Sequence, residues 1–121
     1  KMHGQYRWYH SNGILAEERR FKSGMQTGTE KLYYRNGYLK SEISLQRGIR
    51  NGQFRLYHYS GVLAKSGKMK NGLASGTWRL YYSNGQLRIE GKCKNDRKVG
   101  TWIYYTEDGN VEKTRFFDHD T

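Results

Sequence analysis

The sequence predicts an all-β protein, an elongated single-layer antiparallel β-meander of hairpin repeats. Three observations lead to this fold class. Glycine recurs with a fixed period of 24 residues, strand-like segments in each period flank a turn sequence, and the chain of 121 residues contains no proline. A fixed period of this size is typical of repeat proteins, whose units stabilise one another by stacking. We therefore expect five copies of one hairpin.

Four positions of the repeat hold the same kind of residue in all five copies. The first glycine is found at Gly4, Gly28, Gly52, Gly76 and Gly100. A tyrosine column follows at Tyr9, Tyr33, Tyr57, Tyr81 and Tyr105. A second glycine and an aliphatic residue complete the pattern at Gly13, Gly37, Gly61, Gly85 and Gly109 and at Leu15, Leu39, Leu63, Leu87 and Val111. The predicted organisation is one repeat domain, 1–121, with repeats near 4–27, 28–51, 52–75, 76–99 and 100–121.

The fourth copy predicts the hairpin register. Its segments "TWRLYY" and "LRIEGKC" have strand composition, and Asn-Gly between them is a strong signal for a two-residue type I′ turn. With Asn84 and Gly85 as the turn, the predicted pairs are Tyr82–Leu87, Leu80–Ile89, Trp78–Gly91, Tyr81–Arg88 and Arg79–Glu90. An aromatic ring then covers a bare glycine, and opposite charges meet across the strands.

The other copies agree with this register. It sets Arg7 opposite Glu18, Lys31 opposite Glu42, and Phe54 opposite Gly67, whereas Glu30 opposite Ile43 is the poorest match. The chain is expected to return to the next hairpin through turns at Ser23-Gly24, Arg47-Gly48, Asn71-Gly72 and Asn95-Asp96.

Alternation along the strands predicts two different faces. One is largely apolar and carries Trp8, Leu32, Leu56, Leu80 and Tyr104. The other carries the tyrosine column and a basic column of Arg7, Lys31, Arg55 and Arg79, which Ile103 interrupts in the last copy. A single layer leaves the apolar strip one-sided, so twist is expected to make part of it core, and an exposed remainder would mark a protein partner.

Composition narrows the class of protein. The hydrophobic fraction is 35%, which argues against a thick two-layer core. Twenty-two Lys and Arg against 11 Asp and Glu give a net charge of +11, which attracts anionic partners or simply keeps the array soluble. The lone Cys93 excludes an internal disulfide and shares its repeat position with Phe21, Leu45, Met69 and Phe117, so we expect a small core residue.

The sequence offers no set of residues for catalysis or for a metal. His10 and His58 share a repeat position, but two repeats would separate them by about 19–20 Å, too far to ligate one ion. His3 and His119 lie near the ends, and the glutamates at 18, 42 and 90 are equally dispersed. Phosphate-binding and nucleophile motifs are absent. We expect a protein that is not an enzyme and has no metal or cofactor.

The tyrosine and basic columns are the candidate binding surface. Aromatic residues alternating with Arg and Lys form a platform of stacking and charge, although simple cross-strand packing explains the same pattern. The candidate partner-binding residues are Tyr33, Tyr57, Tyr81, Tyr105, Arg55, Arg79, Lys31, Trp78 and Trp102.

Glycine-aromatic hairpins such as "GTWRLYYSNGQL", returning through "KNG", resemble MORN repeats, specifically the MORN-variant repeats of bacterial YwqK-like antitoxin or immunity proteins. The resemblance covers essentially the whole chain. It implies an elongated β-meander that binds other proteins or acidic phospholipids, and the YwqK-like branch implies neutralisation of a toxin encoded beside it. It carries over no residue-level site, because its signature residues are the structural glycines and aromatics.

Three functions remain open from the sequence. The first is an antitoxin or immunity protein that binds and occludes a cognate toxin. The second is a scaffold or surface protein with another protein partner, and the third is a basic module that binds anionic phospholipid or nucleic acid. A charge of +11 is the wrong sign for imitating DNA in a nuclease site, so occlusion is the expected mechanism. No apolar leader or membrane-spanning run is present, which favours the cytoplasm; a removed leader would place the protein in the periplasm or at the surface. The oligomeric state stays open.

Overall fold

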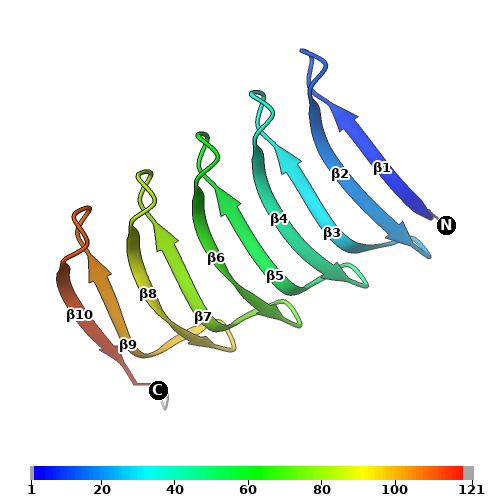
Figure 1. Cartoon of the computed structure of the whole chain (residues 1–121). Coiled ribbons are helices and arrows are strands. Elements are labelled where there is room, and N and C mark those ends of the chain that lie inside the picture. The colour runs from blue at the N-terminus through cyan, green and yellow to red at the C-terminus, as the bar shows by residue number, and fades with distance from the viewer. Residues whose placement is uncertain (1, 119–121) are drawn as a thin grey trace.

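A computed structural model describes residues 2–118, which form one open sheet of ten antiparallel strands in sequence order (Figure 1). The strands are β1 (Gly4–Tyr9), β2 (Leu15–Lys22), β3 (Met25–Tyr33), β4 (Leu39–Gln46), β5 (Ile49–Tyr57), β6 (Leu63–Lys70), β7 (Leu73–Tyr81), β8 (Leu87–Lys94), β9 (Arg97–Tyr105) and β10 (Val111–Phe117). Each repeat supplies one hairpin, so the predicted all-β meander is confirmed. Within residues 2–118 no helix is long and apolar enough to cross a membrane.

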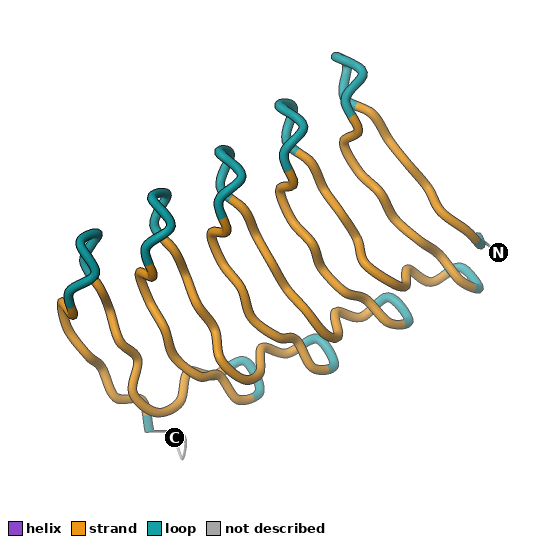
Figure 2. Tube along the Cα trace, in the orientation of Figure 1, coloured by secondary structure: helices purple, strands orange, loops and turns teal. Residues whose placement is uncertain are grey.

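The sheet is a long, bent ribbon with loops along both margins. Figure 2 shows the five hairpin tips in a row along one margin and the return turns along the other, with the strands curving between them. No second layer of structure lies on either side of the sheet in the part of the chain that is described. Within residues 2–118 no other element therefore covers either face of the sheet.

The two margins use different turns. The return turns are the type I′ turns, because both central residues have positive φ, as in Asn71 (51°) and Gly72 (85°). The last return uses Asp96 (72°), where the other three have glycine. Each turn is held by the preceding hairpin; for example, the Gly72 N–H donates to the Arg50 carbonyl over 2.8 Å.

The hairpin tips are three-residue loops, so the predicted two-residue turn at Asn84 and Gly85 is wrong. Gly85 has φ of 90°, but Asn84 does not have a positive φ. The Gly85 N–H donates to the Tyr82 carbonyl over 2.9 Å, and the Tyr82 N–H donates to the Gln86 carbonyl over 2.8 Å. This is a tight turn followed by a glycine bulge, the usual form of a three-residue hairpin loop. The Asn84 side chain accepts the Gln86 N–H over 2.8 Å, which stabilises the loop.

The longer loop changes the register next to the tip and nowhere else in the hairpin. Tyr81 pairs with Leu87 instead of Arg88, so the predicted pair Tyr82–Leu87 is wrong as well, and Arg88 becomes the extra residue of a bulge. Beyond the bulge the predicted register is confirmed in every copy where it was specified: Trp78–Gly91, Arg79–Glu90, Leu80–Ile89, Arg7–Glu18, Lys31–Glu42, Glu30–Ile43 and Phe54–Gly67. One residue added by the loop is thus offset by one residue in the bulge.

The two faces differ as expected. We call the side of the sheet that carries Phe54, Met69, Trp78, Ile89 and Trp102 the tryptophan face, and the opposite side the tyrosine face. The buried hydrophobic residues are Ile43, Phe54, Met69, Trp78 and Trp102, all on the tryptophan face. Cys93 is half-buried and packs against this core, as predicted.

In the last three repeats a tryptophan of one hairpin covers a glycine of the hairpin before it. An added Cβ at Gly91 would lie 2.0 Å from the Trp102 ring, and one at Gly67 would lie 2.1 Å from the Trp78 ring. The ring that covers a glycine therefore comes from the next hairpin, not from the cross-strand partner that the register indicated. The tryptophans are further fixed by hydrogen bonds from their Nε1 atoms to the carbonyls of Ser75 (3.1 Å) and Lys92 (3.0 Å).

A ladder of polar contacts also joins successive repeats. The side chain that follows each tyrosine of the column contacts the tyrosine carbonyl of the next copy. The contacts are His10 to Tyr33 (2.9 Å), Tyr34 to Tyr57 (2.6 Å), His58 to Tyr81 (3.0 Å) and Tyr82 to Tyr105 (2.6 Å). His10 and His58 are thus equivalent members of a structural ladder, two repeats apart.

Candidate binding faces

The tyrosine face brings together seven of the nine predicted site residues. Strand alternation places Lys31, Arg55 and Arg79 on this face in β3, β5 and β7. The tyrosines at 33, 57, 81 and 105 end the odd-numbered strands on the same side and are half-buried. Basic and aromatic side chains therefore share one surface at the repeat spacing of the sheet.

Carboxylates neutralise part of this surface. Arg79 Nε donates to Glu90 Oε2 over 2.6 Å, and Arg7 Nε donates to Glu18 Oε2 over 3.0 Å. Arg55 Nη1 lies 3.8 Å from Glu42 Oε1. The hydrogen bond with Glu90 raises the pKa of Arg79, so its charge is retained at every physiological pH. The face is therefore a lattice of arginine and glutamate pairs and not an uninterrupted positive stripe.

The hydroxyl of Tyr57 is fixed by a carboxylate. Its hydroxyl donates to Glu42 Oε1 over 2.7 Å. Burial, and next the hydrogen bond and charge of Glu42, raise the pKa of Tyr57. The phenol therefore stays protonated and acts as a donor that positions Glu42 between Tyr57 and Arg55.

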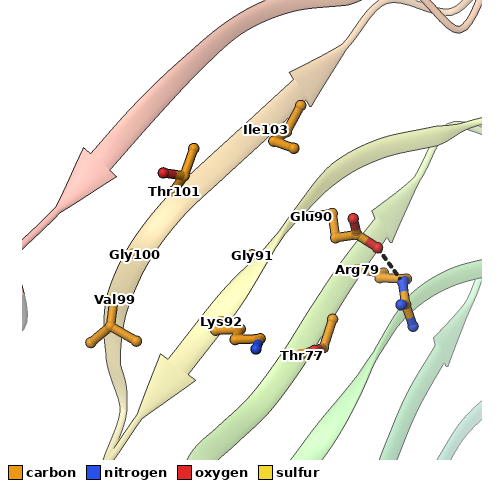
Figure 3. A pocket seen from close by; sticks show the side chains of 9 residues that line it. All are labelled: Thr77, Arg79, Glu90, Gly91, Lys92, Val99, Gly100, Thr101 and Ile103. Carbon is orange, nitrogen blue, oxygen red and sulfur yellow. Dashed lines mark hydrogen bonds and ion pairs between the residues drawn. The ribbon is translucent and has the colours of Figure 1, made fainter.

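A hollow of about 390 Å³ lies on the tyrosine face over β7, β8 and β9. Figure 3 shows its lining, with the Arg79–Glu90 pair at one side and Ile103 and Thr101 on the neighbouring strand. Lys92 and Thr77 complete its polar part. The basic column ends here, because Ile103 replaces the arginine of the preceding repeat.

Trp78 and Trp102, the remaining predicted site residues, are not on this surface. They lie on the tryptophan face and are 5% and 3% exposed. The structure therefore splits the predicted set into an accessible group on one face and two buried core residues on the other.

Sequence reasoning overlooked a set of cations that lie over these aromatic rings. Lys65 Nζ is 5.5 Å from the Trp78 ring centroid, and Lys98 Nζ is 5.0 Å from that of Trp102. Lys98 pairs with Cys93 across the return turn and therefore lies on the face of the core residues. The sequence could have shown this only if the register across the return turns had been worked out as well as the register within each hairpin.

The histidines and acidic residues do not converge. His10 and His58 contact backbone carbonyls, and His3 Nδ1 accepts the Ser23 N–H over 3.2 Å. His119 lies outside the described residues. Within residues 2–118 no group of three or more His, Cys, Asp or Glu side chains could hold a metal ion.

Comparison with known protein families matches four segments, 2–23, 26–46, 74–95 and 98–119, to the MORN repeat variant. Together they span more than half of the chain. Each segment contains one hairpin, and β5–β6, which lies between the second and third segments, has the same hairpin structure. No curated protein matches the chain.

Proposed function

Because the chain belongs to the MORN repeat variant family, a family of repeat-based binding modules, we propose that it is a bacterial immunity protein that binds a cognate toxin and blocks its active site. The observation that supports this function best is the open tyrosine face. A single-layer sheet presents tyrosine and arginine side chains there at regular intervals, with no other part of residues 2–118 covering them.

The chemistry of this face suits a protein partner. Tyrosine and arginine are the residue types that contribute most to binding energy at protein interfaces, together with tryptophan. The half-buried tyrosines at 57 and 81 lie in the central repeats, where neighbouring side chains can exclude water from a contact. Arg79 and Arg55 beside them are oriented by Glu90 and Glu42, which fixes the direction of their guanidinium groups toward a partner.

The net charge of the protein favours a mechanism in which it blocks the toxin's active site over one in which it imitates nucleic acid. At +11 the protein attracts an acidic toxin domain by long-range electrostatics. It has the wrong sign to imitate the phosphate backbone in a nuclease. We therefore propose that the ribbon lies across the mouth of the toxin's active site, without performing chemistry of its own and without a metal or cofactor.

The test is titration of the protein with the product of the neighbouring open reading frame, at low and at physiological salt. We expect binding that survives physiological salt and that weakens more on Tyr57→Ala or Tyr81→Ala than on Arg55→Ala or Arg79→Ala. Lys22→Ala, at the exposed end of β2, is the control and should bind like the unmodified protein.

Anionic vesicles and single-stranded nucleic acid are titrated in parallel. Tight binding to either at physiological salt, with no complex formed by the neighbouring gene product, would contradict the proposed function. Binding of the product without inhibition of its activity would leave a protein-binding array and exclude the immunity role.

A further inference from the structure

The tryptophan face of the last three repeats contains a second hollow, of about 420 Å³. Its floor is apolar, with Phe54, Met69, Trp78 and Trp102 buried, and Leu80 and Ile89 partly exposed where an apolar side chain can contact them. The basic side chains of Arg50, Lys65 and Lys98 line it as well, and Asp96 lies at its margin in the last return turn. The hollow is thus an aromatic floor with a basic rim.

The cations are held in place by the rings. Lys65 Nζ lies 5.8 Å from the Phe54 centroid as well as 5.5 Å from that of Trp78. Lys98 Nζ lies between Trp102 (5.0 Å) and Phe117 (5.4 Å), and Arg50 Cζ is 5.4 Å from Phe54. Cation–π contacts of this kind orient the charged groups but do not neutralise them.

Within residues 2–118 no ion pair with a carboxylate neutralises this rim. The ion pairs within residues 2–118 are Arg7–Glu18, Arg19–Glu17, Arg19–Glu30, Arg55–Glu42 and Arg79–Glu90, and none of them involves a cation of the hollow. Asp96 is the acidic residue among the described residues that line it, and Asp96 Oδ1 already accepts the Ala74 N–H over 2.7 Å. Among the described residues that line the hollow, three cations therefore face one carboxylate above an apolar surface.

We propose that this hollow binds an acidic polypeptide segment in which carboxylates alternate with apolar side chains. In a fully extended segment such side chains point to opposite sides. The bound segment is therefore twisted or bent, so that an apolar group reaches the floor while flanking carboxylates pair with Lys65, Lys98 and Arg50. The ammonium groups keep their ring contacts when a carboxylate approaches from the solvent side.

Other anionic ligands fit this hollow less well. Nucleobases bind by stacking on open ring faces, but Phe54, Trp78 and Trp102 are at most 9% exposed. An anionic bilayer presents its charges on a flat surface, whereas the hollow admits individual side chains. The inference goes beyond the proposed immunity role, because the site lies on the opposite face of the sheet and neither binding event requires the other.

The three tryptophans provide a direct readout. Trp78 and Trp102 form the floor, and Trp8 lies in β1 at the other end of the sheet. A short synthetic peptide that alternates Glu with Leu is titrated into ¹⁵N-labelled protein while the three indole N–H signals are followed. We expect the signals of Trp78 and Trp102 to shift and that of Trp8 to stay, and a peptide with Lys in place of Glu to cause no shift.

Charge removal on opposite faces of the sheet, in β6 and in the neighbouring strands β8 and β9, gives a matched control. Lys65→Gln with Lys98→Gln should weaken binding of the Glu peptide about tenfold, while Lys68→Gln with Lys92→Gln, an equal loss of charge on the tyrosine face, should change it less than twofold. Lys65→Arg with Lys98→Arg keeps the charge and should retain affinity, which separates charge loss from misfolding.

Three results would contradict the proposed peptide site. The first is that no indole N–H signal shifts with the Glu peptide, and the second is that all three signals shift equally. The third is that the two double Gln variants weaken peptide binding equally. Displacement of the peptide by anionic vesicles or an oligonucleotide, with the same variants affected, would instead reassign the hollow to those ligands. Binding of the neighbouring gene product is measured separately on the same variants, so failure of one proposal leaves the other tested.

Discussion

The tryptophan face has two chemically different halves on one repeating backbone. In the first two repeats the ring of Trp8 is 43% exposed, and Arg19 pairs with Glu17 (2.6 Å) and Glu30 (2.5 Å). In the last three, Trp78 and Trp102 are buried against glycines of the preceding hairpin. Arg19 holds the repeat position of Gly91, and Glu30 holds that of Trp102. The same pair of repeat positions thus forms an ion pair between the first two repeats and a ring-over-glycine contact between the last two.

The comparison shows how a repeat array distributes stability. In such arrays stability is close to a sum of unit and nearest-neighbour terms, so the chemistry of each contact decides the local contribution. A partly exposed ion pair contributes up to about 1 kcal/mol, whereas a buried tryptophan contributes several times more. We expect the last three repeats to form the stable part and the first two to open more readily.

Trp102→Ala has the largest expected effect. It should reduce the free energy of unfolding by about 3–5 kcal/mol, because it leaves Gly91 uncovered and removes the most buried ring of the core. The matched change Trp8→Ala should cost less, about 1 kcal/mol, since Trp8 is 43% exposed whereas Trp102 is 3% exposed. Urea denaturation of both variants measures the difference, and equal losses would refute the two-half description.

Gly91→Ala comes next, at about 1–3 kcal/mol, because its methyl group would overlap the Trp102 ring. The same substitution should cost much less in a Trp102→Ala background, where the ring is absent. A double-mutant cycle in urea measures this coupling. An additive result would show that the ring does not cover this glycine.

Glu30→Gln should cost about 1 kcal/mol and act on the first half only. It removes the charge that pairs with Arg19, a contact between partly exposed groups. The loss should shrink in high salt, because screening weakens the pair in the unmodified protein. Hydrogen exchange of β2 and β3 should rise, while exchange in β8 and β9 stays unchanged; a uniform rise would contradict local stability.

Tyr57→Phe probes the boundary between the halves and should cost about 0.5–1.5 kcal/mol through loss of the hydrogen bond to Glu42. The raised pKa of Tyr57 means that the folded state holds the phenolic proton more firmly than the unfolded state. Its contribution is present below the unfolded value of about 10 and is lost as the pH rises above it. Unfolding curves at neutral and alkaline pH should therefore converge for the two proteins as the pH rises.

Arg47→Asn should have the smallest effect, a gain of about 0.5 kcal/mol. Arg47 has φ of 52° in the second return turn, whereas Asn71 and Asn95 hold this position in the later turns. Asparagine tolerates the left-handed conformation better than arginine. A small rise in the midpoint of thermal unfolding checks this, and a fall would show that the arginine side chain stabilises the turn.

Much of the candidate site was predictable because its pattern is local. The tyrosine and basic columns follow from strand alternation and the repeat period, so Tyr57, Tyr81, Arg55 and Arg79 were placed on one face by the sequence pattern. The basic rim of the second hollow was not, because Lys65 and Lys98 come from different repeats. Their position over the rings depends on how neighbouring hairpins pair.

The sequence by itself determined the repeat, the ten strands and the pairing within each hairpin away from its tip, because glycine spacing and alternation act over a few residues. Only the tertiary structure decided the turn type at Asn84, the compensating bulge at Arg88 and the burial of Trp78 and Trp102. Two- and three-residue loops differ by one residue that a bulge absorbs, so both satisfy the same strand pattern. Which ring covers which glycine depends on contacts between hairpins, and these form only when the repeats stack.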